Sequence, residues 1–160
     1  VSTRGKPIIV DANPQMRTWR GDVRDAYYAA ANGRPALTGP LVLIVEFRFP
    51  RPKSHFRTGR RAGELRQDRP HWHTTRPDST KLLRALEDAL NAVAWQDDRQ
   101  IVELSVSKYY VDDAPPGAQV SIGIVTVVGS RTEWDRYGTE GSEEPVPTTV
   151  ETTRKFQAAP

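Results

Sequence analysis

The chain has 160 residues, enough for one domain with a single hydrophobic core. Charged residues make up 27% and apolar residues 37%, a balance typical of a soluble globular protein. The absence of cysteine excludes a disulfide framework, thiol catalysis and Cys-ligated zinc, and it favours a cytoplasmic protein. No apolar run reaches the roughly 18 residues that span a bilayer, and the first residues lack a signal-peptide profile, so we expect no membrane contact.

The net charge of +3 conceals an uneven distribution along the chain. Residues 48–76 carry nine basic side chains and two acidic ones, whereas residues 130–160 carry six acidic and four basic ones. A basic block confined to one stretch is the electrostatic pattern of a protein that binds a polyanion. The predicted phosphate contacts are Arg51, Lys53, Arg57, Arg60, Arg61, Arg66, Arg69, His71, His73 and Arg76.

The first half of the chain contains two segments with a clear period. Residues 4–14 resemble a short strand or extended arm. Residues 15–31 have apolar side chains at helical spacing and end at an Asn-Gly pair, which predicts a helix. The apolar run 41–49, closed by prolines, predicts a strand. Residues 53–74 are basic and have no period, which indicates a mobile surface loop.

The second half begins with the clearest element, an amphipathic helix over about 79–93. Residues 100–113 and 118–128 predict two strands, and the "DAPPG" between them is typical of a hairpin turn. The order predicts an α+β domain over 1–129, with two main helices and a small, mostly antiparallel or mixed sheet. Residues 130–160 are polar, and we expect a flexible C-terminal tail.

Aspartates stand at both ends of the second helix. Asp78 precedes it, and Asp97 and Asp98 follow it. Carboxylates beside a basic block suggest a Mg²⁺-dependent phosphodiesterase, because Mg²⁺ prefers oxygen ligands and needs only one or two carboxylates besides the substrate phosphate. Mn²⁺ is the alternative ion. Each acid also has a structural alternative, with Asp78 as a helix N-cap and "WQDDRQ" as a polar turn.

The length of this helix limits how its acids can meet. A helix of about 15 residues is roughly 22 Å long, so Asp78 and Asp98 lie at its opposite ends. Either the chain folds back, so that the strand after Asp98 runs past the helix start, or two helices pack antiparallel in a dimer. In the second case Asp78 of one subunit meets Asp98 of the other, and the site is shared.

Cations and aromatic residues extend the candidate site. Lys81 and Arg84 could neutralise a scissile phosphate, or Arg84 could simply pair with Asp88 on an exposed face. The aromatic residues near the basic loop, Trp72, Tyr109 and Tyr110, could stack on unpaired bases, although sheet packing is the better default for the two tyrosines. The loop's histidines have no evident fourth ligand for zinc, so we expect them to contact phosphate or solvent.

The stretch "RPDSTKLLRALEDALNAVAWQDDRQIVEL" (76–104) resembles the core motif of the RusA family of Holliday junction resolvases, which are common in phages and prophages. That motif runs Pro-Asp-x-Asp-Asn-Leu, then a lysine and a "DAL" helix, then an aromatic residue and Asp-Asp before a strand. The resemblance is close over about 30 residues. It implies a RusA-like fold and a homodimer, in which two active sites related by a two-fold axis make paired cuts.

The resemblance also implies roles for single residues. Asp78 and Asp98 match motif aspartates expected to bind catalytic Mg²⁺, and Arg84 falls where the family often has a catalytic lysine. Thr80 falls on the second motif aspartate and Lys81 on the asparagine, so the site loses one formal charge and one expected ligand. Either the Thr80 hydroxyl or another acid, Asp97 or Asp88, could compensate.

The implied function is a structure-selective endodeoxyribonuclease, phage- or prophage-encoded, that cuts four-way DNA junctions in the cytoplasm of a bacterial host. The alternative is a catalytically weakened or inactive DNA-binding protein of the same fold. The family's usual N-terminal strand is not evident and the chain begins without Met, so we expect this sequence to start part-way into the protein.

Overall fold

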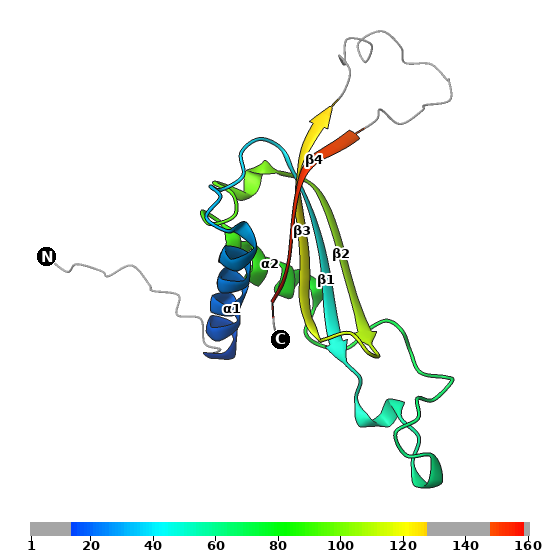
Figure 1. Ribbon diagram of the computed structural model, residues 1–160. Helices are drawn as coiled ribbons and strands as arrows, with labels where there is room; N and C mark the ends of the chain where they lie inside the picture. The colour runs from blue at the N-terminus through cyan, green and yellow to red at the C-terminus, as the bar shows by residue number, and fades with distance from the viewer. Residues whose placement is uncertain (1–13, 128–147, 159–160) are drawn as a thin grey trace, which may run out of the picture.

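The computed structural model describes residues 14–127 and 148–158 (Figure 1). Its elements in chain order are α1 (Pro14–Ala31), β1 (Leu41–Pro50), α2 (Ser79–Leu90), β2 (Ile101–Val111), β3 (Gly117–Val127) and β4 (Thr148–Ala158). Three single-turn 3₁₀ helices complete them: η1 (Lys53–His55), η2 (Gly59–Arg61) and η3 (Asp98–Gln100). The α+β class, the two main helices and a mixed sheet are therefore confirmed.

Both predicted helices form, and their ends have identifiable causes. Pro14 opens α1, a position where its missing N–H costs no hydrogen bond. Asn32 and Gly33 end it with φ of 48° and 75°, the left-handed conformation common after helices. The second helix, α2, stops at Leu90 rather than at residue 93, because the chain turns there and Ala92 adopts a φ of 60°.

The four strands form one sheet in the order β2-β1-β3-β4. β1 is parallel to β2 and antiparallel to β3, and β3 is antiparallel to β4. The predicted hairpin between residues 100–113 and 118–128 is wrong, because β1 lies between these two strands. The turn reverses the chain as expected, but β1, the most apolar strand, takes the central place where both of its edges are paired.

The expected polar tail is wrong for Thr148–Ala158, which pair with β3 as β4. Phe156 and Ala158 are buried in the core, and the buried guanidinium of Arg154 donates to the Tyr27 hydroxyl and, at 2.9 Å, to the Pro35 carbonyl. The rest of the predicted tail up to residue 147, and the predicted N-terminal strand, lie outside the described residues.

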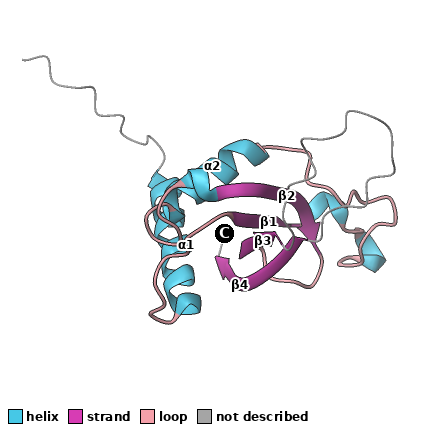
Figure 2. Cartoon of the chain, turned by 90° about the horizontal axis from the view of Figure 1, so that it is seen from above, coloured by secondary structure: helices cyan, strands magenta, loops and turns pink. Residues whose placement is uncertain are grey.

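Both helices cover the same face of the sheet (Figure 2). Alternate β1 side chains, Leu41, Leu43 and Val45, point into this layer and are fully buried against Val23 of α1 and Leu86 of α2. In the part of the chain that the structure describes, no helix is long and apolar enough to cross a membrane.

If β4 belongs to the fold, truncating its buried ring must cost stability. Phe156→Ala removes a side chain that meets the Tyr27 ring edge-on at 5.7 Å, and we expect the free energy of unfolding to fall by about 3 kcal/mol. The neighbouring Lys155→Ala changes an exposed position and should stay within about 0.5 kcal/mol of the parent. Denaturant unfolding measures both, and equal effects would contradict the integration of β4.

Candidate active site and nucleic-acid interface

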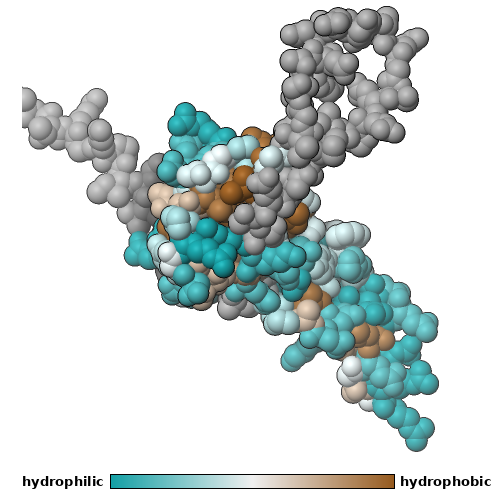
Figure 3. Space-filling model, turned by 45° about the horizontal axis from the view of Figure 1, so that its top comes forward, coloured by the Kyte–Doolittle hydropathy of each residue, from teal (hydrophilic) through white to brown (hydrophobic). Residues whose placement is uncertain are grey.

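Residues 51–77 form an arm that projects beyond the ends of β1 and β2 (Figure 1). It has more regular structure than the mobile surface loop expected from the sequence, since it contains η1, η2 and an antiparallel bridge between Phe56 and Leu65. Backbone hydrogen bonds of 2.7 and 2.9 Å flank that bridge. Most of the arm's visible surface is hydrophilic (Figure 3).

The base of the arm is clamped to the end of β2. Arg51 and Arg69 both donate to the carboxylate of Asp112, Arg69 at 3.3 Å. The Arg51 side chain is only 5% exposed, and its guanidinium lies 5.6 Å from the centre of the Tyr110 ring. Backbone hydrogen bonds of 3.2 and 2.9 Å also join residues 71–73 to the outer edge of β2. Arg51 and Arg69 therefore fix the arm in place.

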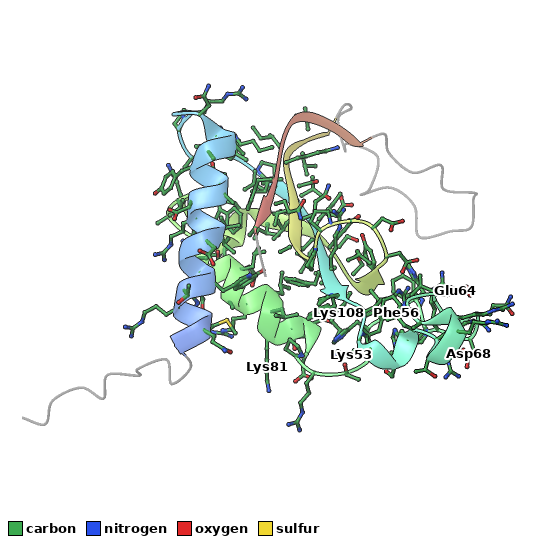
Figure 4. The ribbon with its side chains drawn as sticks, turned by 60° about the horizontal axis from the view of Figure 1, so that its bottom comes forward. Lys53, Phe56, Glu64, Asp68, Lys81 and Lys108 are labelled. Carbon is green, nitrogen blue, oxygen red and sulfur yellow. The ribbon has the colours of Figure 1, made fainter. Side chains whose placement is uncertain are left out.

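Several cations of the arm remain free for a ligand. Within the described residues, those with no carboxylate within 4 Å are Lys53, Arg57, Arg60 and Arg76. Arg61 and Arg66 each have an acidic neighbour on the arm, at 4.0 and 2.8 Å. The arginines at 57, 60, 61 and 66 line an open groove of about 710 Å³, and Lys53, Phe56, Glu64 and Asp68 mark its neighbourhood in Figure 4.

The histidines predicted to contact phosphate pack as rings. His73 is buried and stacks on Phe49, with ring centres 3.8 Å apart. Burial, reinforced by the charge of Lys108, lowers the pKa of His73. His71 is exposed and stacks on Tyr109 at 5.4 Å. His73 therefore stabilises the arm base in its neutral form.

A second open groove, of about 540 Å³, runs along the exposed side of α2. It is lined by Thr80, Lys81, Arg84, Glu87, Asp88 and Asp98. The strand after Asp98 does fold back past the helix start, where Lys108 Nζ donates to the carbonyls of Thr75 and Pro77 at 2.7 Å. Asp98 itself stays beside the C-terminal end of α2, about 18 Å from the start of this 12-residue helix.

The carboxylate of Asp98 is held by the protein core. The indole N–H of Trp95, a fully buried residue, donates to Asp98 Oδ1 at 2.8 Å, and Asn91 Nδ2 donates to Oδ2 at 3.3 Å. The aromatic residue of the sequence motif thus orients the acid three positions later. Asp98 remains exposed and faces the groove.

Asp78 occupies the N-cap position of α2, but its side chain caps nothing. Its carboxylate lies 3.3 Å from Lys81 Nζ, and both side chains are more than half exposed. Lys81 extends from α2 away from the sheet (Figure 4). The structural alternative for Asp78, a capping acid, is therefore not realised. The structure also separates Arg84 from Asp88, which pairs instead with Arg20 of α1 at 2.9 Å.

The carboxylate of Asp97, in contrast, is occupied by its own turn. It accepts the backbone N–H of Arg99 and two bonds from the Arg99 guanidinium, all at 2.9 Å, and the Gln100 side chain closes a capping box. These bonds lower the pKa of Asp97, the Arg99 side chain first. Asp97 does not line the groove, whereas Thr80 does.

Glu87 is a groove residue that sequence reasoning missed. It is half-buried, and burial first, then the negative charges of Asp98 and Asp88, raise its pKa. Thr80 and Glu87 are seven residues apart, so they lie on the same helix face two turns from each other. That spacing was readable in the sequence, but an isolated glutamate in "ALEDAL" is typical of any solvated helix.

The groove offers oxygen donors that suit a hydrated ion. No three acidic or histidine side chains within the described ranges come close enough to enclose a metal. Mg²⁺ rarely needs such a cage, since it keeps several waters and binds through one or two carboxylates. Glu87, Asp88 and Asp98 line the same groove, and carboxylates grouped in this way favour a divalent cation. Asp98 and Glu87 therefore fit Mg²⁺ as a partial ligand set.

The structure is an α+β domain with a basic arm and, along α2, a groove lined by both acids and cations. The family model of the endodeoxyribonuclease RusA matches residues 1–123, and the chain belongs to this family.

One curated relative is the uncharacterized protein YqaN of Bacillus subtilis (strain 168), which is 34% identical over 97 residues. The match spans 58% of this chain and 65% of YqaN, slightly under two thirds of that protein's length. No solved structure matches the chain.

The buried ring of His73 predicts a pH-dependent stability. Because its folded pKa is lowered, the unfolded chain binds more protons than the folded one between that value and the ordinary 6.5, so stability is lost as pH falls through this window. His73→Phe keeps a ring that can stack on Phe49 but cannot titrate. We expect the parent to lose more unfolding free energy than the variant between pH 7.5 and 5.5. Denaturant unfolding at each pH measures this, and equal losses in parent and variant would contradict it.

Proposed function

We propose that the protein is a Mg²⁺-dependent endonuclease, with Mn²⁺ as the alternative ion, that resolves four-way DNA junctions by paired strand cuts as a homodimer. Family membership supports cleavage of DNA in general. The arm and the α2 groove support this particular substrate and chemistry, since one presents unpaired cations and the other combines acids with cations.

The observation that carries the proposal is the order of charges along α2. Lys81 and Arg84 lie in the N-terminal half of the groove, and Glu87 and Asp98 lie at its C-terminal end. This order opposes the helix macrodipole, which favours acids at the start and bases at the end by about 0.3–1 kcal/mol each. Sequences that break a local rule in this way do so at functional sites more often than elsewhere. The groove is polarised so that a phosphate fits one half and a metal ion the other.

Four of the groove residues, and Asp78 at the start of α2, have proposed roles. Bound Mg²⁺ supplies a Lewis acid that activates water and stabilises charge on the phosphate. Asp98 and Asp78 are the proposed ligands, with the Thr80 hydroxyl facing the same groove. Arg84 and Lys81 hold the scissile phosphate while a water oxygen bonds to phosphorus and the bond to the 3′ oxygen breaks. The 3′ oxygen takes a proton, and the nick keeps its phosphate on the 5′ end.

The dimer follows from the position of the two acids. Asp78 and Asp98 lie at opposite ends of an α2 of about 18 Å, a span that one metal ion cannot bridge within a subunit. A two-fold axis that packs two α2 helices antiparallel would bring Asp78 of one subunit to Asp98 of the other. It would also create two sites, as paired cuts on a symmetric junction require.

A DNA-binding protein without catalytic activity is the second candidate, and Thr80 is the observation that favours it. The motif of the family has an aspartate at this position, and the described residues contain no group of three acidic or histidine side chains that could enclose a metal. Such a protein would keep the basic arm and bind junctions without cutting them.

Cleavage of a labelled four-way junction tests the proposal. Asp78→Asn and Asp98→Asn should each slow Mg²⁺-dependent cutting by about a hundredfold, while binding in EDTA is kept or tightened because negative charge is removed near phosphate. The matched control is Asp113→Asn, an exposed acid outside both grooves, which should cut like the parent. Thr80→Asp restores the motif charge and should lower the Mg²⁺ concentration needed for cutting. Binding of junctions without metal-dependent cutting, in the parent and in Thr80→Asp, would establish the second candidate instead.

Mixed dimers test whether the site is shared. A dimer of one Asp78→Asn subunit and one Asp98→Asn subunit contains, under the shared arrangement, one site with both acids and one with neither. We expect this mixed dimer to nick a single strand of the junction. The Asp78→Asn homodimer and the Asp98→Asn homodimer should each lack that activity. If the mixed dimer is as inactive as the homodimers, both acids act within one subunit.

A further inference from the structure

Trp72 is exposed in a way that folding does not explain. The other tryptophans in the described part of the chain are packed, Trp95 completely buried and Trp19 against the core. Trp72 is 58% exposed on the outer edge of β2. A large ring left in water contributes little to stability, and it offers an aromatic face to a ligand.

The surroundings hold this ring in place. The backbone of Trp72 pairs with that of Tyr109 of β2 in an isolated antiparallel β-bridge. The rings of His71 and Tyr109 stack on each other with an angle of 13° between their planes. The Tyr109 hydroxyl donates to Glu46 at 2.7 Å, and Arg48 Nε donates to that hydroxyl at 3.2 Å. We name His71, Trp72 and Tyr109 the aromatic shelf. Its orientation is set before any ligand binds.

In the sequence, Trp72 lies between the residues that line the arm groove and those that line the α2 groove. Trp72 follows the arm's basic tip in the sequence and precedes Asp78 by six residues, a span of at most about 20 Å. The bonds from Lys108 to the carbonyls of Thr75 and Pro77 fix this segment. Arg76, free of a carboxylate partner in the described structure, lies in the same segment. An aromatic face beside free cations suits a flat, π-bonded group attached to a phosphate.

We propose that Trp72 stacks on an unpaired nucleobase at the branch point of DNA, and that this contact selects branched DNA over continuous duplex. The inference rests on the proposed DNA-binding function but not on catalysis. In a continuous duplex both faces of each base are stacked on neighbours and closed to an indole. At a branch point or in a single strand a base can present its face at small cost, and aromatic stacking on it is sequence-tolerant.

Binding in EDTA to a four-way junction, a single strand and a matched linear duplex tests the inference without cutting. Trp72→Ala should bind the junction and the single strand roughly tenfold or more weakly and leave duplex binding unchanged, while Trp72→Phe keeps most of the affinity. Tyr28→Ala is the matched control, because Tyr28 on α1 is also 58% exposed and should affect none of the three. Arg60→Ala should instead weaken binding to all three DNAs. It should also lower the slope of log binding constant against log salt concentration by about one.

Two outcomes overturn the inference. One is a Trp72→Ala protein that binds all three DNAs as tightly as the parent, or that loses the same factor of affinity for all three. The other is a change in its sedimentation mass, which would assign Trp72 to a contact between protein chains. The nuclease proposal fails separately, through uncut junctions in Mg²⁺, whatever Trp72 does. If Trp72→Ala then still loses affinity for the junction and the single strand but not for the duplex, the inference holds for a DNA-binding protein without catalytic activity.

Discussion

The parallel pairing of β1 and β2 is the constraint on which the rest of the structure depends. Two parallel strands cannot be joined by a tight turn, so the chain must return to the end of the sheet where β1 starts before β2 can begin. The connection here leaves the end of β1 as the arm and returns as α2. This route places the basic arm at one end of the sheet and Asp98 at the other, with α2 between them. The separation of Asp78 and Asp98 is therefore a consequence of the sheet topology.

Trp95 couples that return path to the site. Its side chain is fully buried at the point where α2 ends, its neighbour Ala94 accepts a 2.8 Å hydrogen bond from Leu37 N, and its indole N–H reaches Asp98. Burying an indole is favourable only if its N–H finds an acceptor, and here the acceptor is the groove carboxylate. The core thus positions Asp98 through Trp95, and removing the acid would leave a buried donor unpaired.

The elements that sequence reasoning found are those whose signal is local. The period of α1 and α2, the apolar run of β1 and the basic block all depend on neighbouring residues, and the acids at the ends of α2 followed from a motif. The order of strands depends on competition for a central position, so the turn signal at "DAPPG" could not show that β1 would come between β2 and β3. β4 was missed because its polar side chains give no apolar period, and only its pairing with β3 and the burial of Phe156 define it.

The same limit applies to charged residues, whose type is readable from sequence but whose partner is not. Arg51 and Arg60 are equivalent in a count of basic residues, yet Arg51 is buried against Asp112 and Arg60 is free. Removing Arg51 would leave Asp112 with one cation fewer and loosen the arm, whereas removing Arg60 subtracts one phosphate contact. The number of cations that can respond to salt in DNA binding is therefore smaller than the sequence count.

The α2 groove shows how an altered motif can retain its charge. Thr80 removes an acid at the start of the helix face, and Glu87 places one on the same face two turns later, beside Asp98. The charge is conserved but displaced by about 10 Å along the axis, too far for Glu87 to act as the missing ligand of Asp78. It lines the groove together with Asp98, and burial first, then the charge of Asp98, raises the pKa of Glu87. Among the described residues, the acids that line the groove thus gather towards the C-terminal end of α2, away from Asp78 at its start. This is the arrangement expected if Asp78 completes a site on a second subunit.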